Sequence, residues 1–182
     1  EGATKCEVYK CIDYFSKNFG KSRFHHIEYF LSNILSFHPA ELLNKKESIL
    51  NSFSKQCKKL YLSAEITPNF IDFLTQLDGT KYVASGSEQE ELRYVFRERN
   101  LSKYFKGIFG SPTRKSELVN KIISKEPDSR VLMFGDAESD FDASKDNEID
   151  FCAYLPFSNV PEKLMVLSRI NNFKVIENWS SI

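Results

Sequence analysis

The sequence lacks several features that would point to other classes of protein. Lysine plus arginine and aspartate plus glutamate number 25 each, which leaves no net charge at pH 7, whereas a nucleic-acid-binding domain usually carries a basic excess. No apolar run approaches the length of a membrane span, and no signal peptide is recognisable. Neither a GxGxxG nor a GxxxxGK[ST] loop occurs, so a nucleotide-binding domain lacks support. We expect no nucleic-acid partner and no membrane association.

Cysteine is scarce and scattered. The four cysteines, at positions 6, 11, 57 and 152, form no CxxC pair and no zinc-binding spacing. We interpret them as free thiols in a reducing compartment and predict a cytoplasmic location. The 182 residues suffice for one buried core and a small additional domain.

The two parts of the chain follow different patterns. Residues 1–64 show apolar residues at helical spacing and no convincing strand, so we predict a small helical domain there. From residue 65 to residue 182, short apolar segments alternate with helical ones. Strands are predicted at 81–84, 107–109, 130–134, 151–155 and 173–176, and helices at 69–77, 88–100, 115–125, 139–145 and 161–168. This alternation is typical of an α/β fold with a Rossmann-like parallel sheet.

Polar residues follow three of these strands, at the ends where parallel sheets bind ligands. In VASGSEQEEL, Ser85 closes a strand and Gly86 permits a tight turn, so a hydroxyl and free backbone N–H groups could bind phosphate. Ser87 and Glu90 are interpreted as a capping box of the next helix. In GSPTRKSEL, Lys115 lies near a helix start, where a cation is unfavourable. It either stabilises a nearby anion or is solvated.

The third signal is acidic. In LMFGDAESDFDAS, Asp136 follows the strand and Asp140 lies in the first turn of the next helix. Acids in a first turn can simply complement the helix dipole, but two converging carboxylates can also hold Mg²⁺. We predict that Asp136 and Asp140 bind Mg²⁺ and that Asp142 and Asp146 are exposed to solvent.

Taken in this order, the signals resemble the haloacid dehalogenase (HAD) superfamily of phosphatases. In that family a serine or threonine closes the second strand, a lysine follows the third, and GDxxxD follows the fourth; VASGS, GSPTRK and GDAESD match. ITPNFIDFL looks like the helix that leads back into the core of capped members, which would make residues 1–64 the cap. The resemblance implies Mg²⁺-dependent hydrolysis of a small phosphorylated substrate, with sugar phosphates as one candidate. We expect a monomer or a homodimer.

The resemblance also implies individual roles. Ser85, with Gly86 beside it, would bind a phosphoryl oxygen, and Lys115 would neutralise charge on the nucleophile and the phosphate. Asp136 would bind Mg²⁺, and Asp140 would hold the metal or orient Lys115.

A contact from the cap is expected as well. Arg23 lies in the polar turn between the first two predicted cap helices. It either pairs with a second anionic group on the substrate or has only a structural role, as a helix cap or an exposed side chain.

The nucleophile that the resemblance implies is not found. HAD phosphatases attack phosphorus with an aspartate on the first strand, and a second aspartate two residues later is the acid and base; Asp13 in KCIDYF has no such partner. Without a strand between those ending at Ser85 and Asp136, buried backbone groups stay unpaired. Each costs on the order of 1–3 kcal/mol of a domain's roughly 5–15 kcal/mol. We therefore expect an upstream segment of roughly 25–30 residues, which the lack of an initial methionine also favours.

Two alternatives remain open. A phosphosugar mutase could have the same capped architecture. A non-catalytic HAD-like module could bind a ligand or partner without turnover, and an intact DxD motif upstream would favour the enzyme over this module.

Overall fold

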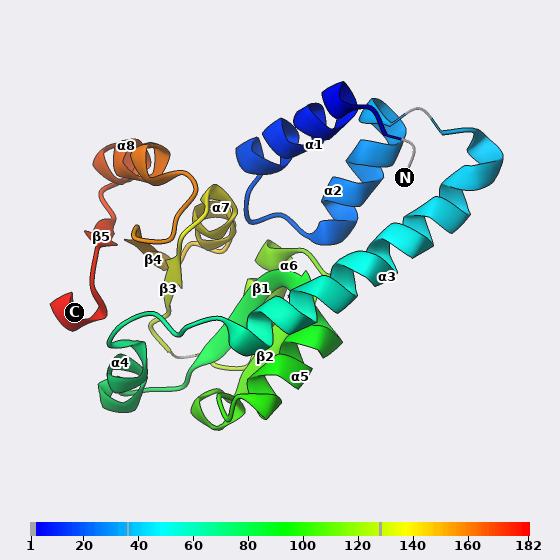
Figure 1. Ribbon diagram of the computed structural model, residues 1–182. Helices are drawn as coiled ribbons and strands as arrows, with labels where there is room; N and C mark the ends of the chain where they lie inside the picture. The colour runs from blue at the N-terminus through cyan, green and yellow to red at the C-terminus, as the bar shows by residue number, and fades with distance from the viewer. Residues whose placement is uncertain (1–2, 36, 128) are drawn as a thin grey trace.

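Helices form the N-terminal part of the chain. The computed structural model describes residues 3–35, 37–127 and 129–182, and Figure 1 shows these helices beside the sheet-containing part. They are α1 (Lys5–Lys17), α2 (Arg23–Tyr29), the π-helix η1 (Phe30–Ile34) and α3 (Pro39–Ser63). Helix α1 begins at a capping box between Thr4 and Glu7. Across the described ranges, no helix combines the length and apolar character needed to cross a membrane.

Strands and helices alternate in the rest of the chain, as the sequence pattern predicts. The strands are β1 (Tyr82–Glu88), β2 (Gly107–Ser111), β3 (Leu132–Gly135), β4 (Asp150–Tyr154) and β5 (Lys174–Ile176). The helices are α4 (Phe70–Gln76), α5 (Gln89–Glu98), η2 (Ser102–Tyr104), α6 (Lys115–Ile123), α7 (Glu138–Asp146), α8 (Pro161–Asn171) and η3 (Trp179–Ser181). Strand β1 is longer than predicted, because it resumes after a register irregularity between Ala84 and Glu88.

All pairings between strands are parallel, and they form two separate sheets. Strand β1 pairs with β2, and β4 lies between β3 and β5. Each strand of the second sheet brings apolar side chains to a shared core, in which Phe141, Phe151 and Leu164 are buried. The α/β fold with a parallel sheet is therefore confirmed.

A gap separates the facing edges of β1 and β3. Within the described part of the chain, no strand joins the two sheets, and an apolar cavity of about 450 Å³ lies between them. Its lining includes Val83 and Ala84 from β1, Met133 and Phe134 from β3, and Phe73 from α4. The gap lies between the two strands that were expected to flank an additional strand.

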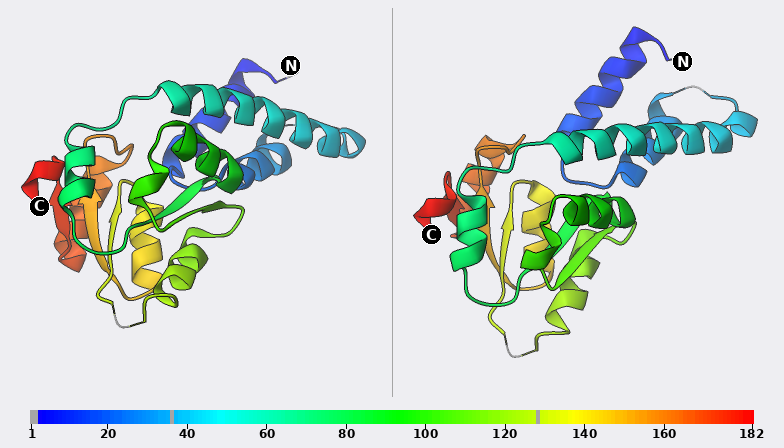
Figure 2. Two further views of the ribbon diagram at one scale, coloured as in Figure 1. Left: turned by 90° about the horizontal axis from the view of Figure 1, so that it is seen from below. Right: turned by 60° about the horizontal axis from the view of Figure 1, so that its bottom comes forward.

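The helical domain covers one side of the core, as both views of Figure 2 show. The turn after α1 contacts the core closely, and a glycine lies on each side of the contact: Gly20 in the turn and Gly86 in β1. A Cβ on Gly20, whose φ is +89°, would lie 2.4 Å from the Oγ of Ser139, and one on Gly86 would lie 2.8 Å from the carbonyl oxygen of Gly20. Because neither residue has a Cβ, the cap turn can lie directly against the strand ends.

Candidate functional site

A cavity of about 400 Å³ lies between the helical domain and the carboxyl ends of β1 and β3. Every residue that the sequence analysis placed in the site lines this cavity: Arg23, Ser85, Gly86, Lys115, Asp136 and Asp140. The structure therefore brings the predicted residues together, although their contacts differ from one to the next.

Lys115 and Asp140 form an ion pair inside the cavity. The ammonium of Lys115 donates to Oδ1 of Asp140 and lies 3.4 Å from Oγ of Ser139. The second oxygen of Asp140 accepts the backbone N–H groups of Asp136 at 3.1 Å and Ala137 at 3.0 Å. Both oxygens of Asp140 are therefore used within the chain, which matches its expected role of orienting Lys115 better than metal binding. The cation at the start of α6 is stabilised by this buried carboxylate.

Gly135 makes this arrangement sterically possible. A Cβ at this position would lie 2.3 Å from the Cβ of Asp140 and 2.6 Å from its Oδ2. Only glycine lets the Asp140 carboxylate lie this close to the end of β3 and receive the two backbone N–H groups.

Asp136 has no side-chain partner among the residues that the structure describes. Burial, and then the negative charge of Asp140, raises the pKa of Asp136 to about 6, although the ammonium of Lys115 opposes this. A half-buried carboxylate without a cation partner is suited to a metal ligand. In the described ranges, however, no cluster of three or more His, Cys, Asp or Glu could hold a metal. Mg²⁺ binds through one or two carboxylates together with phosphate and water, so Asp136 fits as one ligand of several.

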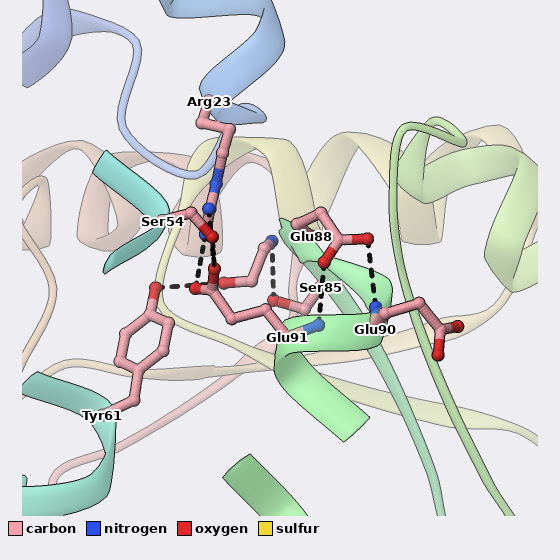
Figure 3. A network of polar contacts seen from close by, with 8 residues as sticks. Arg23, Ser54, Tyr61, Ser85, Glu88, Glu90 and Glu91 are labelled. Atoms are coloured by element: carbon pink, nitrogen blue, oxygen red, sulfur yellow. Dashed lines mark hydrogen bonds and ion pairs between the residues drawn. The ribbon is translucent and has the colours of Figure 1, made fainter. Parts of the chain in front are cut away.

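The serine segment at the carboxyl end of β1 differs from the predicted capping box, as Figure 3 shows. Glu88, not Ser87, caps α5, and its carboxylate accepts the N–H groups of Glu90 and Glu91. Ser87 instead shares a hydrogen bond of 3.1 Å with the hydroxyl of Tyr61 from the cap. Its N–H donates to Oγ of Ser85 at 3.1 Å, and no described residue accepts a hydrogen bond from the Ser85 hydroxyl.

Arg23 lies at the cavity wall, but its guanidinium is paired within the chain (Figure 3). Its two terminal nitrogens donate to the two carboxylate oxygens of Glu91 at 2.9 Å and 2.8 Å. The side chains are 4% and 1% exposed, and Ser54 also donates to Glu91. Burial raises the pKa of the Glu91 carboxyl, but the bonds from Arg23 and Ser54 outweigh it and hold the pKa low. The Arg23–Glu91 pair joins the helical domain to the α/β part. It uses the N–H groups of Arg23 that were considered for binding an anionic group of the substrate.

Sequence reasoning missed Glu91 and His26. Glu91 lies in an acidic run, which is typical of a solvent-exposed segment. The sequence indicates its burial only through its position beside Leu92 and four residues before Val95, on the buried face of α5. His26 was not singled out by any sequence pattern. It is 3% exposed, it lines the cavity, and neither ring nitrogen has a hydrogen-bond partner in the described structure.

The environment of His26 predicts a pH-dependent contribution to stability. Burial, followed by the positive charges of His25 and Lys21, lowers the pKa of His26 to about 4. The unfolded chain, with an ordinary histidine pKa of 6.5, therefore binds this proton more readily between pH 6.5 and pH 4. Stability must fall as the pH is lowered through this range.

We expect His26→Phe to reduce the slope of unfolding free energy against pH between 4 and 6.5. Urea denaturation at several pH values measures it. His38→Asn is the matched control, because His38 is exposed and caps α3. An unchanged slope in His26→Phe would contradict the burial of a neutral imidazole.

Comparison with known proteins finds a likeness in structure. No family model and no curated protein matches it. Among solved structures it is similar to a haloacid dehalogenase-like family hydrolase from Streptococcus pneumoniae, with 16% sequence identity and a TM-score of 0.56 over 91% of this chain and 90% of that chain. At this identity the likeness establishes the fold alone. The chain has a haloacid dehalogenase-like α/β fold.

Proposed function

We propose that this protein hydrolyses phosphomonoesters of small metabolites in a Mg²⁺-dependent reaction. The observation that carries the proposal is one cavity lined by the hydroxyl of Ser85, the ammonium of Lys115 and the unpaired carboxylate of Asp136. Phosphoryl transfer depends mainly on positioning and on compensating negative charge. The likeness in fold to a hydrolase supports this as an analogy.

Each residue has a distinct part in this proposal. The Ser85 hydroxyl, held by the N–H of Ser87, would donate to a phosphoryl oxygen. Lys115, held in place by Asp140, would compensate charge on the phosphate without rearranging. Asp136 would contribute one carboxylate ligand to Mg²⁺, which supplies further positive charge at the phosphate when bound.

We propose that the nucleophilic aspartate enters on a strand that fills the gap between β1 and β3. The cavity in the gap and the cavity of the site share Val83, Ala84, Phe134, Gly135 and Asp136 in their linings. A strand that occupies the gap in parallel with its neighbours therefore ends at the site. It would also pair the facing edges of two strands that otherwise leave backbone groups unsatisfied.

Hydrogen exchange in the natural protein tests whether the gap is filled. We expect amides in β1 and β3 to exchange about as slowly as those in β4, because each strand would then have two neighbours. Strand β4 is the internal reference, since it pairs with both β3 and β5, and β5 represents an edge strand. Exchange in β1 and β3 as fast as in β5 would contradict a strand in the gap.

An assay with 4-nitrophenyl phosphate, with and without Mg²⁺, tests the activity. Turnover that depends on Mg²⁺ is expected. The contrary outcome, no turnover despite saturable phosphate binding, would favour a non-catalytic module.

A further inference from the structure

The wall that the helical domain contributes to the cavity is mainly aromatic. Phe15 lies in α1, and Phe19 lies in the turn that follows this helix. Phe53 and Tyr61 come from α3. Phe15 and Phe53 remain 39% and 37% exposed. Aromatic faces left open in this way can pack against an apolar or aromatic ligand.

Among the described residues, this wall offers no uncompensated buried charge. The guanidinium of Arg23 donates two hydrogen bonds to Glu91 and lies over the ring of Phe53, 4.9 Å from its centroid. Lys21 also lines the cavity, but it is exposed and its ammonium donates to Asn18 at 2.8 Å. A second anionic group on a ligand would therefore enter this half of the cavity without a free buried cation to receive it.

His26 is a buried polar residue of this wall. Its ring packs against Phe15, with the two centroids 4.7 Å apart, and both ring nitrogens lack a partner in the described structure. A buried polar group without a partner is costly, so such groups usually meet a ligand or water. Its low pKa keeps the imidazole neutral at pH 7, and a neutral imidazole offers one donor and one acceptor. A hydroxyl group matches both.

We propose that the helical half of the cavity binds an uncharged leaving group with an aromatic or apolar face, and that His26 hydrogen-bonds a hydroxyl on it. The inference rests on the proposed function for the phosphate half of the cavity. It replaces the expectation that Arg23 receives a second anionic group, because Arg23 already has an anionic partner in Glu91.

Binding of non-hydrolysable phosphonates to the natural protein tests this independently of turnover. The probes are 4-(hydroxymethyl)benzylphosphonate, benzylphosphonate and phosphonoacetate, titrated calorimetrically with Mg²⁺ present. We expect affinity to fall in that order, with the hydroxyl contributing about 3–10-fold. Only the hydroxymethyl probe should shift the His26 ring resonances strongly in NMR spectra.

Variants of His26 separate a hydrogen bond from packing. His26→Phe should abolish the preference for the hydroxyl, and His26→Asn, which keeps a donor and an acceptor, should retain part of it. His38→Asn should leave all three affinities unchanged, and thermal denaturation shows whether each variant is folded.

The proposal is overturned if phosphonoacetate binds tighter than benzylphosphonate, if His26→Phe keeps the hydroxyl preference, or if no probe shifts the His26 resonances. Its failure is distinct from that of the proposed function. Turnover of 4-nitrophenyl phosphate without the expected order of affinities would remove only the leaving-group assignment. The expected order without any turnover would remove only the hydrolase.

Discussion

Replacing Glu91 by glutamine lowers the free energy of unfolding by about 3–5 kcal/mol, because the change leaves the guanidinium of Arg23 buried without a counter-charge. The pair is 4% and 1% exposed and carries two hydrogen bonds between cap and core. Against a domain stability of roughly 5–15 kcal/mol, such a loss is large. Urea denaturation followed by circular dichroism measures it.

Two controls show whether the unpaired charge is responsible. The double change Arg23→Met with Glu91→Met removes both charges, and its cost should be much smaller than that of Glu91→Gln alone. Glu90→Gln removes an exposed partner of Arg93 in the same helix and should change stability by less than about 1 kcal/mol. If Glu91→Gln were as mild as Glu90→Gln, the buried contact between the domains would be wrong.

Lys115→Ala and Asp136→Asn each lower the turnover of a phosphomonoester by at least about 10²-fold, the effect typical of losing one preorganised charge. Lys115 is the ammonium held by Asp140, and Asp136 is the cavity carboxylate that has no side-chain partner in the described structure. The rates are measured with 4-nitrophenyl phosphate at saturating Mg²⁺. Asp136→Asn should in addition raise the Mg²⁺ concentration needed for half-maximal activity, whereas Lys115→Ala should not.

Exposed neighbours of the same chemical type are the matched controls. Lys121 lies in α6 with Lys115, and Asp142 lies in α7, two residues after Asp140; both are exposed. Lys121→Ala and Asp142→Asn should leave the rate within about two-fold, as expected for surface charges far from preorganised contacts. Equal losses in the control and the site variants would reject the roles assigned to Lys115 and Asp136.

The convergence of the site was predictable because of a property of parallel sheets. Successive parallel strands end at the same edge, so a polar residue after each strand must lie near the others. Ser85, Lys115 and Asp136 line one cavity for this reason. Asp142 and Asp146 were predicted to be exposed to solvent, and the structure confirms their exposure.

Partners that come from distant segments were not predictable. Ser87 was assigned to the cap of α5 from its spacing to Glu90, but Glu88 lies closer to the helix start and its longer carboxylate reaches two N–H groups. The hydroxyl of Ser87 is then available to Tyr61 of the cap. Local spacing cannot distinguish a Ser87 cap from a Glu88 cap, because either side chain can accept the free N–H groups at the start of α5.

The sequence by itself determined the alternation of strands and helices, the division between a helical and an α/β part, and the edge at which the polar residues gather. These depend on periodicity and chain order, which are local properties. The tertiary structure decided what Arg23 and His26 contact: Arg23 meets Glu91, 68 residues away, and His26 is buried at the cavity without a described partner. Charge pairing and burial depend on which surfaces are brought together in the folded chain. The sequence pattern around an arginine or a histidine is the same whether its side chain is free or paired.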